Sequence, residues 1–302
     1  MSPISALRTP DSRFMDLPGF GFKPHYLDAL PGFEGLRMHY VDEGPAAAST
    51  TVLCLHGEPT WSYLYRKMIP VFAAAGCRVI APDLFGFGRS DKPVKDADYS
   101  YRFHRQSLLE LVQGLDLQNI CLVCQDWGGI LGLTLPMDMP QRFSRLLVMN
   151  TALPIGEPPS AGFMAWREYM QQTPDLDVGR LMQRSTQVLR PDEAAAYDAP
   201  FPDRHYKAGV RRFPELVMTH PGMEGIAESK RALEFWSQDW DGQSFMAIGQ
   251  ADPVLGEPVM QSLRSHIRNC PEPMLVPEAG HFVQEWGEEI AHAACAHFCM
   301  GL

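Results

Sequence analysis

Positive charge is scarce in this sequence, and so are long apolar runs. The 302 residues carry 26 lysines and arginines against 36 aspartates and glutamates, a formal net charge of -10, which argues against nucleic acid or an anionic membrane surface as a partner. No window approaches about 18 uninterrupted apolar residues, so no bilayer-spanning helix is predicted. Residues 1–11 also lack the apolar core of a signal peptide, and we therefore expect a cytoplasmic protein.

Cysteine is scarce as well. Its seven copies are an odd number, scattered and mostly set in apolar runs, a pattern typical of reduced thiols that pack as small hydrophobic side chains. Cys121 and Cys124 form a C-x-x-C, but residues three apart on a strand point to opposite faces, so we expect no redox pair. Cys295 and Cys299 share a helix face without a second pair of ligands nearby, which favours core packing over a zinc site.

The sequence does contain a regular alternation of strand and helix patterns. With 45% hydrophobic and 21% charged residues, it has the composition of a soluble globular enzyme with one large core. Short apolar runs predict buried strands at 52–55, 78–83, 120–124 and 146–150, and helical patterns occupy 63–75 and 101–115. This alternation predicts an α/β fold with a mostly parallel sheet and helices on both of its faces.

From about Pro154 the pattern changes. Prolines and a glycine break the chain there, and the stretch to about Pro221 has helical patterns without strands. Strand patterns return at 244–249 and 274–277, and a last helix is predicted at 288–298. We therefore predict a core domain formed by residues 1–154 and 221–302, with an inserted helical cap domain at 155–220.

The most informative segment runs from Ile120 to Leu133. An apolar strand leads into Gln125-Asp126-Trp127-Gly128-Gly129, after which a helix continues. A strand, a tight turn and a helix in this order form a nucleophile elbow, which presents its central side chain at the end of a parallel strand. The residue at the apex is Asp126 rather than serine or cysteine. The pattern therefore predicts a carboxylate nucleophile that forms an alkyl ester with its substrate.

Such a nucleophile needs a base, and the base needs an acid that orients it. In hydrolases with this elbow the acid and then a histidine follow the nucleophile in the chain, each just beyond a strand. Asp252 and His281 each follow a predicted strand, which makes Asp126, Asp252 and His281 the predicted catalytic triad. Asp239 and Asp241 are alternative acids, but both precede the strand and fit turn positions better.

The loop at His56-Gly57 follows an early strand, where such hydrolases place an oxyanion-hole amide. We predict that the backbone N–H groups of Glu58 and Trp127 donate to the carbonyl oxygen of the Asp126 ester. An ordinary turn is the alternative interpretation of this loop.

Four runs of the chain resemble a known family. They are residues 56–67 (HGEPTWSYLYRK), 82–93 (PDLFGFGRSDKP), 125–129 (QDWGG) and 279–285 (AGHFVQE). In these runs, and over nearly the whole chain, the sequence resembles the haloalkane dehalogenases, with the weakest likeness in the first half of the helical stretch. One mild departure is Cys124, which stands where hydrolases generally have a glycine. The resemblance implies an α/β-hydrolase fold and the hydrolysis of haloalkanes to a primary alcohol, a halide and a proton, through a covalent alkyl-aspartate ester.

The resemblance also implies how the leaving halide is held. A halide ion is large and weakly basic, so it needs hydrogen-bond donors in a dry pocket more than it needs a proton. Trp127 matches one ring N–H donor of the family. One branch takes the second donor from an asparagine in the His-Gly loop, where this chain has Glu58. The branch that it resembles uses a cap tryptophan, and Trp166 is the candidate; an aromatic of the cap core is the alternative interpretation.

A small neutral substrate requires an apolar pocket. Positions beside the motifs suggest the following lining residues, each of which could equally serve packing alone: Ile130, Phe163, Val210, Phe213, Pro214, Val217 and Leu255. In the implied mechanism His281, supported by Asp252, activates water against the ester, and neither a metal nor an organic cofactor is needed. The expected partners are a halogenated aliphatic substrate, water and a halide ion, and a monomer with a role in detoxification is expected.

Three other functions stay open at this point. An epoxide hydrolase would use the same aspartate with cap tyrosines as acids, and the cap contains Tyr169, Tyr197 and Tyr206. A fluoroacetate-type dehalogenase would need cations for the substrate carboxylate, and the cap contains Arg167, Arg211 and Arg212. A non-catalytic binding protein of this fold usually loses a triad member, whereas every triad position is filled here. Substrate length, halogen preference and tunnel width depend on how the cap packs.

Overall fold

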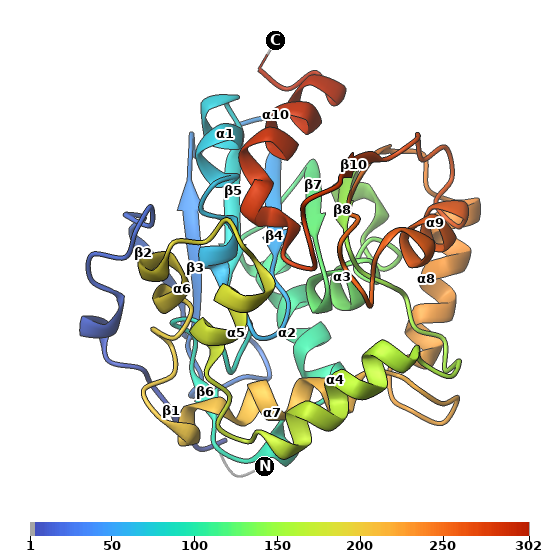
Figure 1. Cartoon of the computed structure of the whole chain (residues 1–302). Helices are drawn as coiled ribbons and strands as arrows, with labels where there is room; N and C mark the ends of the chain where they lie inside the picture. The colour runs from blue at the N-terminus through green and yellow to red at the C-terminus, as the bar shows by residue number, and fades with distance from the viewer. Residues whose placement is uncertain (1–3, 302) are drawn as a thin grey trace.

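A central sheet of eight strands organises the chain, whose computed structural model describes residues 4–301. The strand order is β10-β9-β8-β7-β4-β5-β3-β2 (Figure 1). The strands are β2 (Pro24–Leu27), β3 (Met38–Glu43), β4 (Thr51–Leu55), β5 (Arg78–Pro82), β7 (Ile120–Cys124), β8 (Phe143–Met149), β9 (Gln243–Gly249) and β10 (Met274–Val276). Neighbours from β5 to β10 run parallel, and β3 pairs antiparallel with both β5 and β2. The predicted fold class is confirmed.

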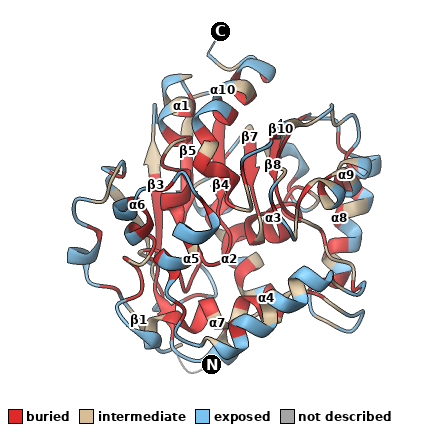
Figure 2. Cartoon of the chain, in the orientation of Figure 1, coloured by how far each residue is buried: buried red, intermediate tan, exposed pale blue. Residues whose placement is uncertain are grey.

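The middle of the sheet is its most deeply buried part. Every residue of β4 and of β7 is buried, as expected for apolar strands that are covered on both faces. Figure 2 shows buried residues concentrated in the sheet and exposed residues on the outer sides of the helices. The nucleophile elbow therefore begins on a strand that is held rigidly by neighbours on every side.

Helices flank the sheet and carry the chain between its strands. They are α1 (Ile69–Ala74), α2 (Tyr101–Gly114), α3 (Trp127–Gly132), α8 (Ile226–Gln238), α9 (Glu257–Ser265) and α10 (Gly287–His297). α1 packs against α10, and α2 packs against α3. Smaller elements are the ribbon of β1 (Ala6–Leu7) with β6 (Lys92–Pro93) and the 3-10 helices η1 (Asp11–Phe14), η3 (Asp96–Asp98) and η4 (Pro140–Arg142). Within residues 4–301 no helix combines the length and apolarity needed to cross a bilayer.

One predicted helix is divided in the structure. The stretch predicted at 63–75 forms a 3-10 helix, η2 (Ser62–Tyr65), followed by α1. Pro70 stands in the first turn of α1, where a residue without an amide hydrogen costs no helical hydrogen bond. The helix predicted at 288–298 is confirmed as α10, and the 3-10 helix η6 (Val283–Trp286) precedes it.

Between β8 and β9 the described chain forms helices and loops only. The helices before α8 are α4 (Ala161–Gln172), α5 (Val178–Ser185), α6 (Pro191–Ala196), the 3-10 helix η5 (Arg204–Lys207) and α7 (Ala208–Leu216). Figure 1 shows α4, α5 and α7 at the end of the sheet where α3 begins, which is the carboxyl end of β7. These helices occupy the stretch predicted as a cap at 155–220.

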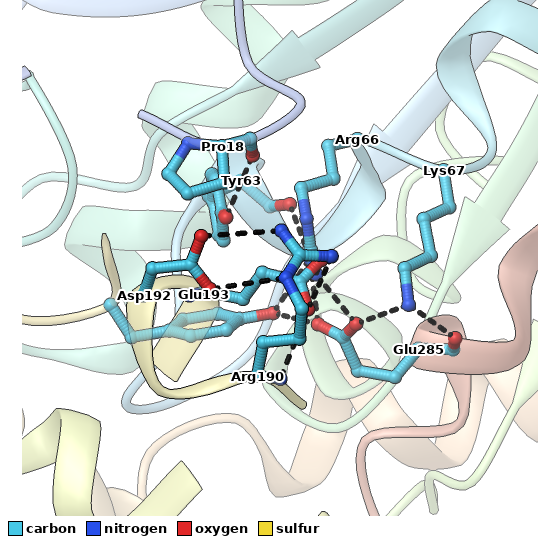
Figure 3. A network of polar contacts seen from close by, with 9 residues as sticks. Pro18, Tyr63, Arg66, Lys67, Arg190, Asp192, Glu193 and Glu285 are labelled. Atoms are coloured by element: carbon cyan, nitrogen blue, oxygen red, sulfur yellow. Dashed lines mark hydrogen bonds and ion pairs between the residues drawn. The ribbon is translucent and has the colours of Figure 1, made fainter. Parts of the chain in front are cut away.

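A buried charged cluster ties these helices to the core (Figure 3). Arg66, just after η2, donates to both carboxylate oxygens of Glu285 at 2.7 and 2.8 Å, and to Glu193 of α6 at 3.1 Å. Lys67 Nζ lies 3.0 Å from the same Glu285 carboxylate. Since Glu285 belongs to η6, directly after His281 and its loop, the cluster links α6 to the segment that carries the predicted base.

Candidate active site

The elbow turns sharply at Asp126. This residue has φ +50° and ψ -127°, a backbone conformation that L-residues rarely adopt and that is common in functional turns. It lies between the buried β7 and α3. A Cβ at Gly128 would collide with the backbone oxygen of Leu55, and one at Gly129 would collide with the side chain of Thr151. The two glycines let α3 begin close against β4, so that the Asp126 side chain is presented at the end of the strand.

The structure brings the three predicted triad residues together. His281 Nδ1 lies 2.8 Å from Asp252 Oδ2, and His281 Nε2 lies 3.5 Å from Asp126 Oδ2. Asp252 follows β9 and His281 follows β10, as expected for chain segments that leave neighbouring parallel strands. The ring is thus held between two carboxylates, one at each nitrogen.

Asp252 is fixed as an anion by the groups around it. Asn150 donates to its Oδ2 at 3.0 Å, and the backbone N–H groups of Val254 and Leu255 donate to its Oδ1 at 2.9 and 3.0 Å. Burial alone would raise the pKa of Asp252, but His281 and these N–H groups lower it well below the ordinary range. Sequence reasoning missed Asn150. The signal that could have identified it is its position directly after β8, the strand next to the one that carries the elbow.

The two neighbouring carboxylates also determine the pKa of His281. Burial by itself lowers the pKa of an imidazole, but the carboxylates of Asp252 and Asp126 outweigh it and raise the pKa of His281 to about 10. An imidazolium at this position is therefore stabilised by a carboxylate at each of its two nitrogens.

One of the two predicted oxyanion donors is in place. The backbone N–H of Glu58 donates to Asp126 Oδ1 at 2.9 Å, and a Cβ at Gly57 would overlap the Asp126 carboxylate, which explains the glycine. The backbone N–H of Trp127 makes no such bond within the part of the chain that the structure describes. The Glu58 side chain is buried and its pKa is raised well above the usual range by burial and by the Asp126 charge.

A cavity of about 490 Å³ opens beside the triad. Its wall is mainly apolar and combines the core with α4, α5 and α7. Five of the seven predicted wall residues lie on it: Ile130, Phe163, Pro214, Val217 and Leu255. The other two, Val210 and Phe213, correct the prediction. Both are buried behind the wall, and the Phe213 ring packs edge-on against Trp127 with 4.8 Å between ring centroids.

Trp127 and Trp166 both face this cavity from opposite domains of the predicted fold. Among the described residues, neither indole N–H has a hydrogen-bond acceptor in the protein, whereas those of Trp236 and Trp240 are bound to Leu133 and Ser244. Two unpaired donors that face one apolar cavity suit a large anion.

Known proteins with similar sequences share this site's fold. The family model described as "alpha/beta hydrolase fold" matches residues 50–288. A haloalkane dehalogenase of Psychrobacter cryohalolentis is 44% identical over 295 residues, covering 95% of this chain and 96% of its own, and one of Mycobacterium marinum is 43% identical over 294 residues, covering 95% and 98%. The chain belongs to the haloalkane dehalogenase family. The family and the activity class predicted from the sequence are thereby confirmed.

A solved dehalogenase structure has nearly the same backbone. The haloalkane dehalogenase DpaA of Paraglaciecola agarilytica, described as tetrameric, is 55% identical and superposes with a TM-score of 0.96, covering 98% of this chain and 100% of its own.

The cap groups that rival activities would need lie elsewhere in this dehalogenase. Tyr169, Tyr197 and Tyr206 do not line the cavity; Tyr197 instead donates to Glu285 at 2.5 Å, in the buried charged cluster around Arg66. Arg167 is paired with Glu215 and Arg211 with Asp96, away from the cavity wall. Arg212 does not line the cavity either, so among the described residues the cavity contains neither a tyrosine acid for an alkoxide nor an arginine or lysine for a carboxylate.

Proposed function

We propose that this dehalogenase uses Asp126 to displace halide from an sp³ carbon. The Glu58 N–H holds Oδ1, so Oδ2 is the oxygen free to attack a substrate in the cavity. The carbon–oxygen bond forms as the carbon–halogen bond breaks, and the electron pair leaves with the halide. Trp127 and Trp166 donate to that halide from their ring N–H groups. The observation that carries this proposal is that Trp127 and Trp166, whose indole N–H groups have no partner among the described residues, line the same mainly apolar cavity as Asp126.

His281 serves the second half of the reaction. In the ester the Asp126 charge is gone, and His281 Nε2 takes a proton from water as that water attacks the Asp126 carbonyl carbon. Asp252 stabilises the imidazolium that forms. The Glu58 N–H stabilises the charge on Oδ1, and the Trp127 N–H becomes a second donor once the carbonyl rehybridises. When the tetrahedral intermediate collapses, the ester C–O bond breaks and the imidazolium of His281 protonates the leaving alkoxide, so that the alcohol departs. The restored Asp126 carboxyl group loses its proton to solvent and becomes a carboxylate again. No resident cofactor takes part in these steps.

The test combines substrate profiling with a trapped intermediate. The enzyme is expected to release halide from chloro-, bromo- and iodoalkanes and to leave styrene oxide and fluoroacetate unchanged. His281→Gln should release one halide per enzyme and then stop, with the mass of Asp126 increased by the alkyl group in peptide mass spectrometry. A His281→Gln variant that turns over at the wild-type rate would refute the assignment of the base.

The state in solution is a separate proposal. We propose a monomer in the cytoplasm, as the sequence suggested, with the tetramer described for DpaA as the alternative. Light scattering decides between them, because the monomer mass is 33.8 kDa. A mass about four times larger would replace the monomer with the assembly of the relative.

A further inference from the structure

The residue before the nucleophile reaches the base. Gln125 is fully buried, and its Nε2 lies 3.0 Å from His281 Nε2 and donates to the His281 backbone oxygen, also at 3.0 Å. Its Oε1 accepts a hydrogen bond from Gln284 Nε2 at 3.2 Å. The proposed mechanism has no task for this amide, although it touches the nitrogen that must take up the proton.

The orientation of the Gln125 amide follows from its partners. A carbonyl oxygen only accepts, so the Gln125 group that faces the His281 backbone oxygen is the NH₂. Its second hydrogen then points to His281 Nε2. Gln284 is oriented in the same way, since its Nε2 also lies 3.5 Å from the Tyr65 hydroxyl, whose own hydrogen is donated to Leu55 O at 2.7 Å.

This orientation favours one protonation state of the base. Asp252 binds the Nδ1–H of His281, so a neutral ring carries its lone pair on Nε2, where it accepts from Gln125. An imidazolium would instead direct an N–H at the N–H of Gln125. A hydrogen bond to the neutral form disfavours the charged form.

We propose that Gln125 is a positioning residue that disfavours protonation of His281, so that the ring is a free base in the alkyl-enzyme. The inference rests on the proposed function, in which His281 activates water. It also gives the buried Gln284–Gln125 pair a purpose, because Gln284 holds Gln125 in the orientation that presents its hydrogens to the histidine.

The need for such a group follows from the charges around the ring. The titratable side chains that face His281 are Asp126, Asp252 and Glu58, from three different loops. The carboxylates of Asp126 and Asp252 stabilise an imidazolium, whereas burial raises the pKa of Glu58 and favours its neutral form. Esterification removes only the Asp126 charge, and Asp252 stays in contact at 2.8 Å. The Gln125 amide, whose Nε2 lies 3.0 Å from His281 Nε2, disfavours the protonation that these carboxylates favour.

The kinetic test is the pH profile of kcat, whose acid limb reports the base in the alkyl-enzyme. Gln125→Met removes the donor and keeps the side-chain length. We expect the acid limb to move to higher pH by about one unit, the equivalent of one ordinary hydrogen bond. Gln284→Met removes the group that orients Gln125 and should move the limb in the same direction by a smaller amount. The matched control is Gln118→Met, at an exposed site away from His281, which should move the limb by less than about 0.3 unit. A Gln125→Met enzyme whose kcat falls equally at every pH, with an unmoved limb, would overturn the proposal.

A second measurement does not depend on turnover. In an Asp126→Ala background, which lacks the nucleophile charge as the ester does, ¹⁵N NMR follows the titration of His281. Adding Gln125→Met should raise the titration midpoint by about one unit, and Gln125→Asn, which is too short to reach Nε2, should do the same if the methionine variant does not fold. An unchanged midpoint contradicts the role of Gln125, whereas absent halide release from every haloalkane contradicts the proposed function instead.

Discussion

The indole N–H groups of four tryptophans fall into two kinds; a fifth, Trp61, is buried in the core and its N–H also lacks a partner among the described residues. Trp236 and Trp240 donate to protein acceptors at 2.7 and 2.9 Å, as buried indoles usually do. Trp127 and Trp166 face the cavity with their N–H groups unpaired among the described residues. An unpaired donor in a mainly apolar cavity is costly until an anion arrives, which supports the proposed halide-binding role of these two indoles.

Trp166→Phe tests this role directly. Phenylalanine keeps an aromatic ring in the wall and removes only the donor, so halide affinity should fall roughly 10- to 100-fold, the range expected for a hydrogen bond to a charged group. Halide quenching of tryptophan fluorescence measures it. The control is Tyr169→Phe, because Tyr169 packs beside Trp166, with 5.9 Å between ring centroids, but does not line the cavity. Equal halide affinity in wild type and Trp166→Phe would show that Trp166 only packs.

The residue scale also shows where sequence reasoning reaches its limit. Asp126, Asp252 and His281 could be placed because each follows a recognisable strand. Val210 and Phe213 could not, because their direction depends on the rotation of α7 about its axis; they point to the core side, where Phe213 meets Trp127 and His104. Gln125 escaped notice because its function depends on an orientation that only its three-dimensional partners determine.

At the scale of elements, the elbow depends on how closely α3 approaches β4. The backbone oxygens of Leu55 and His56 occupy the space that a Cβ at Gly128 would need. Neither oxygen can move without displacing β4, which is buried at every position and paired on both sides. The glycine is therefore a requirement of packing as well as of the turn.

Gly128→Ala should lower the free energy of unfolding by about 3 kcal/mol or more, since a rigid backbone cannot relax around the added methyl group. Urea unfolding followed by circular dichroism measures the loss. Gly114→Ala, at the end of α2, is the control: nothing lies near its would-be Cβ, and stability should change by no more than about 1 kcal/mol. Two variants of equal stability would mean that β4 and α3 separate more easily than their packing suggests.

Elements were predictable where they were long and strongly patterned. The parallel strands β4, β7 and β9 appear within a residue or two of their predicted bounds. No strand was predicted at the antiparallel β2 and β3, whose residues mix polar and apolar types; β2 is only partly buried, and the buried part of β3 includes His39. It also merged η2 with α1, because helical periodicity does not distinguish two short helical pieces from one longer helix.

At the scale of the whole molecule, buried histidines in the core make the free energy of unfolding depend on pH. His104 is fully buried among Tyr99, Phe103 and Phe213, and neither ring nitrogen has a partner in the described part of the chain. Burial lowers the pKa of His104 to about 3. His56 is buried as well, and burial lowers its pKa.

These shifts predict how stability depends on pH. Both folded-state pKa values lie below the value near 6.5 of an unfolded histidine, so the unfolded chain binds protons that the folded protein does not. Their contribution is fully present above about pH 6.5 and is lost as the pH falls. His281 acts in the opposite sense, because its pKa is raised; its contribution is complete below pH 6.5 and is lost only on the alkaline side. Between about pH 6.5 and 4.5 the buried neutral histidines lower stability as the pH falls, while Glu58 and Asp198, whose pKa values are raised, act in the opposite direction.

His104→Leu should flatten the slope of stability against pH. Leucine has a similar volume and takes up no proton, so the variant should lose less stability than wild type between pH 6.5 and 5, by up to about 2 kcal/mol. Urea midpoints at several pH values provide the measurement, and His205→Leu, at an exposed site, is the control. What matters is the slope and not the absolute stability, since any packing defect from the leucine shifts all pH values together. A slope equal to that of wild type would mean that His104 gains its proton without unfolding, and hence that water reaches this part of the core behind Phe213 and the active-site wall.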